Sequence, residues 1–140
     1  MQKKIPIRLP QIKRAVKVIL KEKNISQGEL SLVFVTGERI KSFNKKFLHR
    51  NYSTDVLAFE RQGKRKQGEI RGDIVISIDT ARKNAQRFKT SLAYEIVLYV
   101  VHGILHLLGF DDHKPTDIKK MRREEQKLMN HLGNQIKNII

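Results

Sequence analysis

The chain alternates between segments in which apolar residues recur at helical spacing and short runs of β-branched and other apolar residues. The first pattern predicts helices that bury one face, and the second predicts strands. Strands are predicted over residues 30–36, 54–59 and 70–78, with residues 3–9 as a candidate first strand. Helices are predicted over residues 12–24, 38–48, 80–88, 92–108 and 115–132, and a polar loop over residues 61–68. Without repeats or linkers, this pattern predicts one α+β domain, residues 1–140, with a small mixed β-sheet flanked by helices.

Short polar residues mark the predicted helix ends. Asp79 is the expected N-cap of the helix that ends near Phe88, because a side-chain oxygen there accepts an N–H of the first turn. Thr90 or Ser91 is expected to cap the apolar helix that follows. Gly109 is expected to end that helix in a left-handed conformation.

The apolar helix carries two histidines four residues apart, His102 and His106. Residues at this spacing lie on one side of a helix, so both imidazoles can reach one ion, zinc or another divalent transition metal. The alternative is a pair of packed or capping histidines, although an apolar helix has little reason to carry two imidazoles that nothing satisfies. The glycine turn at Gly109 resembles the metzincin layout, which predicts a zincin-like fold with a metal-binding helix.

The third metal ligand is expected just after the glycine turn, where the sequence reads Asp111-Asp112-His113. Either His113 or, as the alternative, Asp112 completes the site, since zinc binds both imidazole and carboxylate. The chain has no cysteine, which excludes thiolate ligands. Gly103 stands where a His-Glu-x-x-His peptidase has its general base. The candidate proton acceptors are therefore Asp111 and whichever of Asp112 and His113 does not bind the metal.

Two acidic residues outside this segment allow two interpretations each. Asp73 lies in an apolar strand, where it either orients a ligand or makes a structural hydrogen bond. Glu95 precedes His102 by seven residues and so lies on nearly the same helix face. It either supports the metal ligands or is an ordinary acidic residue at a helix start.

The charge balance favours a polyanionic partner. Lys and Arg total 29 against 14 acidic residues, a formal net charge of +15. Each cation placed against a phosphate releases counterions, which favours nucleic acid over the alternatives, enhanced solubility or an anionic membrane surface. Residues 1–20 hold no apolar core of signal-peptide length, and residues 96–110 are too short to span a bilayer. We therefore expect a cytoplasmic nucleic-acid-binding protein that does not bind membranes, and the absence of cysteine fits that location.

The histidine segment, His-Gly-Ile-Leu-His-Leu-Leu-Gly-Phe-Asp, resembles the signature of the YbeY family of bacterial endoribonucleases. The segments TDVLAF (54–59) and GDIVIS (72–77) occur in the family's order, so the resemblance covers residues 30–125. It implies one zinc ion in a cleft beside the sheet and cleavage of single-stranded RNA. It also implies a role in ribosomal RNA maturation and ribosome quality control, with ribosomal RNA and the small ribosomal subunit as partners. No DNA specificity is expected.

Two positions depart from the family's pattern. The family's third histidine falls at the position of Asp112, and His113 stands one residue later. The family's functional arginine directly follows an aromatic residue, whereas Phe47 is followed here by Leu48, with Arg50 two positions on. The resemblance therefore assigns the catalytic arginine to Arg50 in a shifted position.

Basic residues near the predicted cleft are expected to form an RNA-binding rim that follows the phosphates. They are Lys45, Lys46, Arg50, Lys64, Arg65 and Lys66. Two other functions remain open: a non-catalytic ribosome- or RNA-binding factor with a structural zinc, and a metallopeptidase, which Gly103 and the positive charge disfavour.

Overall fold

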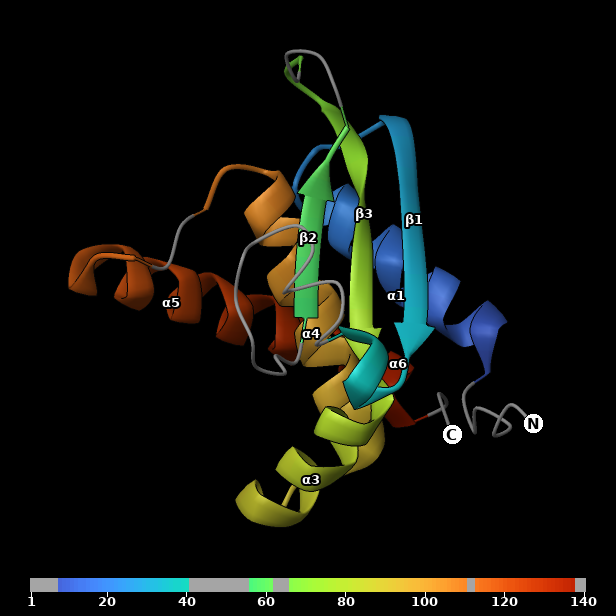
Figure 1. Ribbon diagram of the computed structural model, residues 1–140. Coiled ribbons are helices and arrows are strands. Elements are labelled where there is room, and N and C mark those ends of the chain that lie inside the picture. Colours follow the sequence, from blue (N-terminus) through green and yellow to red (C-terminus); the bar gives the residue numbers. More distant parts are fainter. Residues whose placement is uncertain (1–7, 41–55, 62–65, 111–112, 138–140) are drawn as a thin grey trace.

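The computed structural model describes residues 8–40, 56–61, 66–110 and 113–137 (Figure 1). Its centre is a three-stranded sheet in the order β1-β3-β2. The strands are β1 (Gln27–Val35), β2 (Val56–Glu60) and β3 (Glu69–Ser77). Because β1 runs parallel to β3 and β2 runs antiparallel to it, the sheet is mixed, which confirms the predicted α+β class.

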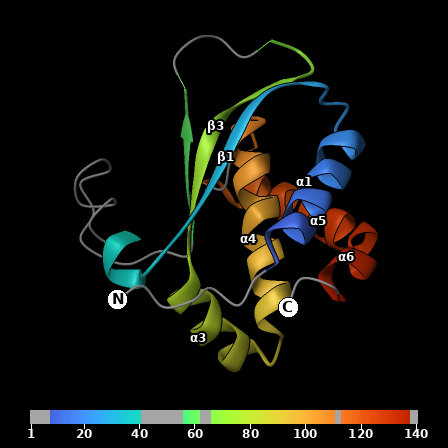
Figure 2. The ribbon, with the colours of Figure 1, turned by 90° about the vertical axis from the view of Figure 1, so that its right-hand side faces the viewer.

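Helices cover mainly one face of this sheet. They are α1 (Leu9–Glu22), α3 (Ile78–Phe88), α4 (Leu92–Leu107), α5 (Pro115–His131) and α6 (Gly133–Lys137). Figure 2 shows α1, α4, α5 and α6 together on one side of the strands. α4 packs against β2 and β3, and both α1 and α5 pack against α4. On the opposite face, Ile40, from a helical segment that is described over residues 37–40, packs with Leu57 and Val75.

The side chains of β3 alternate between these two faces, as the period of a strand requires. Ile70, Ile74 and Ile76 are buried toward α4, whereas Val75 is buried with Leu57 on the other face. β3 is therefore covered on both sides and paired along both edges, and its C-terminal half, residues 74–76, is continuously apolar.

Glycine in β3 brings α4 close to the sheet. A Cβ atom at Gly72 would lie 2.7 Å from Cδ2 of Leu107 and 2.7 Å from the carbonyl oxygen of Phe59. A side chain at position 72 would therefore clash with the backbone of β2 and force the Leu107 side chain to move. Leu107 follows directly on the histidine pair.

The observed helix ends correct one prediction and confirm two. Ser77, not Asp79, caps α3: its Oγ accepts the N–H of Thr80 at 3.1 Å. The carboxylate of Asp79 instead accepts the N–H of Gly37 at 2.9 Å, and so serves the neighbouring helical segment. Ser91 caps α4 as predicted. Gly109 follows the other end of α4 with φ +101°, which confirms the positive φ predicted for this residue.

The predicted strand over residues 3–9 is not tested as a whole, because residues 1–7 lie outside the described ones; Leu9 belongs to α1. The predicted helix over residues 38–48 is seen only over its first residues, since residues 41–55 also lie outside.

Within the described ranges, no single helix is long and apolar enough to cross a membrane. α3 and α4 meet the length and hydropathy criteria only as a pair, and the pair is bent by 117° at the break between them. α4 itself is largely buried in the core.

Candidate metal centre

His102 and His106 lie side by side on the C-terminal half of α4. Their ring centroids are 4.7 Å apart and the ring planes meet at 74°, an edge-to-face arrangement. Both side chains are partly buried. The structure therefore brings together the two imidazoles that the sequence pairs, as the i, i+4 spacing requires.

The imidazole of His102 also contacts a second helix. Its Nδ1 lies 3.3 Å from Oε1 of Glu125 in α5. The exposed fractions of the two side chains are 23% and 15%, so the contact is shielded from most of the solvent. This carboxylate was not among the residues that the sequence indicated.

Gly103 fixes how this face of α4 meets the sheet. A Cβ atom at position 103 would lie 2.7 Å from Cγ2 and 2.9 Å from Cδ1 of Ile74 in β3. A glutamate at this position would have to displace Ile74 from the core. The residue that serves as general base in His-Glu-x-x-His peptidases thus has no room here.

The chain reverses directly after the histidine pair. The N–H of Gly109 donates to the carbonyl of His106 at 3.0 Å, and that of Phe110 donates to the carbonyl of Leu105 at 3.0 Å. These two bonds and the positive φ of Gly109 make a Schellman motif. The predicted turn at Gly109 is confirmed.

The third ligand stays a prediction. His113 is exposed, and Asp111 and Asp112 lie outside the described residues. Among the residues that the structure does describe, no three His, Asp or Glu side chains are grouped so that they could hold an ion.

The comparisons with known proteins agree with the sequence motif. The family model described as Endoribonuclease YbeY matches residues 1–133. The chain belongs to this family. It is 37% identical over 132 residues to endoribonuclease YbeY of Syntrophus aciditrophicus (strain SB), covering 91% of this chain and 82% of that protein. It is 33% identical over 139 residues to endoribonuclease YbeY of Bacillus licheniformis, covering 90% and 86%.

A solved structure shares the fold. The solution structure of TM1509 from Thermotoga maritima superimposes with a TM-score of 0.67 at 27% identity, covering 93% of this chain and 85% of that one. The mixed sheet and its covering helices therefore also occur in that protein.

The remaining residues predicted for the YbeY-type site are only partly placed. Lys66 is exposed. Arg50 lies outside the described residues, as do the other basic residues of the predicted rim, Lys45, Lys46, Lys64 and Arg65. Of the six residues predicted to form an RNA-binding rim, the structure describes only Lys66, and the rim stays a prediction.

Asp73 and Glu95 both make hydrogen bonds within the fold. Asp73 accepts a hydrogen bond from Arg61 at 3.0 Å, and this bond raises the pKa of the Arg61 guanidinium. Glu95 is 3% exposed and accepts from Thr90 at 2.8 Å and from Tyr99 at 3.5 Å. Glu95 lies in the first turn of α4, as the helix-start interpretation predicts.

The described side chains supply two of the ligands that a borderline divalent ion such as zinc would need. Two neutral imidazoles suit such an ion, and the carboxylate behind His102 is the kind of partner that metal-ligating histidines commonly have. These residues would hold it: His102 and His106 from α4, with the third ligand from the segment after Gly109.

Proposed function

We propose that this chain is a metal-dependent endoribonuclease that cleaves single-stranded RNA during ribosomal RNA maturation and ribosome quality control. The observation that carries the proposal is the half-buried pair His102 and His106, with Glu125 behind it, in a member of a family named for endoribonuclease activity. The proposed location is the cytoplasm.

The proposed ion is a single zinc, or another divalent transition metal, in a zincin-like arrangement of helix and glycine turn. Two ligands come from α4. The third is His113, with Asp112 as the alternative. When bound, such an ion acts as a Lewis acid toward a phosphoryl oxygen or lowers the pKa of a bound water.

The chain's own residues supply the remaining functions. Arg50 stabilises the charge that develops on the phosphate, because guanidinium pairs with phosphate oxygens in a bidentate way. Asp111 accepts the proton, since position 103 holds no carboxylate. The lysines and arginines of the rim hold the phosphates on either side of the cleaved bond.

The proposed partners are ribosomal RNA and the small ribosomal subunit. The net charge of +15 supports a polyanionic partner of this kind. DNA specificity and membrane binding are not part of the proposal.

A second candidate is a non-catalytic RNA-binding factor with a structural zinc. The packing of Gly103 against Ile74 favours it, because it leaves no general base beside the first histidine. The same packing counts against a metallopeptidase.

Cleavage of single-stranded RNA by purified protein tests the proposal. The His102→Ala, His106→Ala double variant should lose both bound metal and cleavage, with RNA affinity changed by no more than a few-fold, since cationic contacts and metal ligands are separate groups. His131→Ala is the matched control, because His131 lies on α5 with 48% of its side chain exposed. A double variant that cleaves like the wild type would assign the activity to a contaminant or to another site, and a metal-binding wild type without cleavage would favour the structural zinc.

A further inference from the structure

The Glu125–His102 contact depends on tertiary packing. The two residues are 23 positions apart and belong to helices that pack against each other. The distance of 3.3 Å is slightly longer than the usual N–H···O bond of about 2.7–3.2 Å, and hydrogen bonds of this kind are often long in ligand-free sites.

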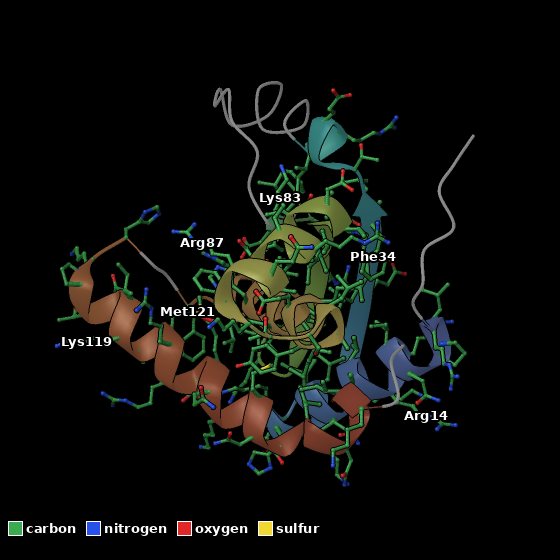
Figure 3. The ribbon with its side chains drawn as sticks, turned by 90° about the horizontal axis from the view of Figure 1, so that it is seen from below. Arg14, Phe34, Lys83, Arg87, Lys119 and Met121 are labelled. Atoms are coloured by element: carbon green, nitrogen blue, oxygen red, sulfur yellow. The ribbon has the colours of Figure 1, made fainter. Side chains whose placement is uncertain are left out.

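The sequence of α5 turns Glu125 toward α4. Met121, Leu128 and Met129 are buried and lie at helical spacing from Glu125, so they share its face. Figure 3 shows Met121 on the side of α5 that faces α4, whereas Lys119 lies on the outer side. A carboxylate on an inward face destabilises the fold unless a donor satisfies it, and the imidazole of His102 is such a donor.

We propose that Glu125 is a positioning residue that holds His102 with its N–H on Nδ1 and its lone pair on Nε2. A neutral imidazole carries one N–H, and an acceptor facing one nitrogen fixes the N–H there. Nε2 then becomes the ligand atom beside His106.

Glu125 acts through His102 and does not itself bind the ion. Its oxygen lies at Nδ1, and the two ring nitrogens of an imidazole point in divergent directions. A carboxylate in this place orients the ring and makes the other nitrogen a stronger ligand. The metal half of this inference rests on the proposed function, whereas the tautomer of His102 is a property of the metal-free chain.

The tautomer is measured on metal-free protein by ¹⁵N NMR of the imidazole nitrogens at pH about 8, above the ordinary histidine pKa of about 6.5. We expect the Nδ1–H form of His102 in the wild type and in Glu125→Gln, whose amide oxygen still accepts, and a loss of that preference in Glu125→Ala. The wild-type spectrum needs no variant, so it stands even where Glu125→Ala folds poorly. A wild-type His102 in the Nε2–H form would overturn the proposal.

Metal affinity is measured by calorimetric titration with Zn²⁺. Glu125→Ala should weaken binding about 10–100-fold, and Glu125→Gln should stay within a few-fold of the wild type. Glu124→Gln is the matched control, since it removes the neighbouring carboxylate, which binds Lys23, and should leave the affinity unchanged.

Equal losses in Glu125→Gln and Glu125→Ala would replace positioning with a plain ion pair and overturn the proposal, as would wild-type affinity in Glu125→Ala. A wild type that binds no Zn²⁺ would overturn the proposed function and the metal half of the inference, while the NMR result still decides whether Glu125 holds His102.

Discussion

The ammonium group of Lys23, at the end of α1, binds the carboxylate of Glu124 in α5. The pair joins two helices that both pack against α4. The exposed fractions of the two side chains are 20% and 23%, so solvent screens the pair less than a fully exposed one. The hydrogen bond from Lys23 lowers the pKa of Glu124 below its ordinary value, against the opposing effect of burial.

This shift predicts how the stability of the fold responds to acid. Because the folded pKa of Glu124 is below its unfolded value, the pair stabilises the fold above the ordinary value of 4.5, and the contribution is lost as the pH falls through the folded pKa. Glu124→Gln should lower the free energy of unfolding by about 1 kcal/mol at pH 7, and the difference from the wild type should shrink below pH 4.5. Urea denaturation over this pH range measures it.

Lys23→Met serves as the control for this prediction. It removes the partner cation, so Glu124→Gln in that background should have a smaller effect at pH 7. A difference between wild type and Glu124→Gln that stays constant from pH 7 to pH 3 would contradict the assignment.

The contact between Gly103 and Ile74 predicts that the effect of Gly103→Ala on the free energy of unfolding changes sign when Ile74 is truncated. Gly103→Ala should cost about 1 kcal/mol of stability, because overpacking against Ile74 outweighs the gain in helix propensity. In an Ile74→Ala background the clash is removed, and the same change should stabilise by about 1 kcal/mol. Gly133→Ala, at a position where a Cβ atom meets nothing within 4 Å, should not destabilise the fold. If Gly103→Ala has the same effect in both backgrounds, the close packing of α4 on β3 is wrong.

RNA binding should weaken steeply with rising salt, given the net charge of +15. Neutralising Lys64, Arg65 and Lys66 together should reduce the salt slope by about 0.7 for each lost phosphate contact on a single strand. Neutralising the exposed α5 residues Lys119, Arg122 and Arg123 is the matched control. If the control alters the slope and the loop variant does not, α5 and not the loop carries the RNA surface.

The third ligand can be identified by metal titration of two variants. We expect His113 to be the third ligand, because a third imidazole leaves the ion a stronger Lewis acid than a carboxylate does. His113→Ala should therefore weaken Zn²⁺ binding more than Asp112→Ala. An Asp112→Ala variant that binds no metal, beside a His113→Ala variant that does, would reverse the assignment.

The elements that local pattern determines were predictable. Short runs of β-branched and other apolar residues predicted the three strands, and the apolar helix with Ser91 and Gly109 at its ends appears as α4. The error at Asp79 arose because Ser77 and Asp79 are both good caps. The pairing of Val35 with Ser77, which the sequence does not display, ends β3 there and leaves Ser77 to begin the helix.

Glu125 was missed for a related reason. It follows Arg122, Arg123 and Glu124 in a charged segment that is typical of a solvated helix face. Consecutive helix residues point about 100° apart, so Glu124 reaches Lys23 while Glu125 reaches His102. The helical spacing of Met121, Leu128 and Met129 indicated which face of α5 is buried. Only the packing of α5 on α4 shows that this face contacts the histidine helix.

The most direct test of the central claim is the cleavage rate of single-stranded RNA as zinc is returned to chelator-treated protein. The account predicts no cleavage without metal, and a rate that rises in proportion to bound zinc and levels off at about one ion per chain, as expected for a single catalytic site. The His102→Ala, His106→Ala double variant should stay inactive at every zinc concentration. Full cleavage by the metal-free wild type, or equal activity of the double variant, would contradict it.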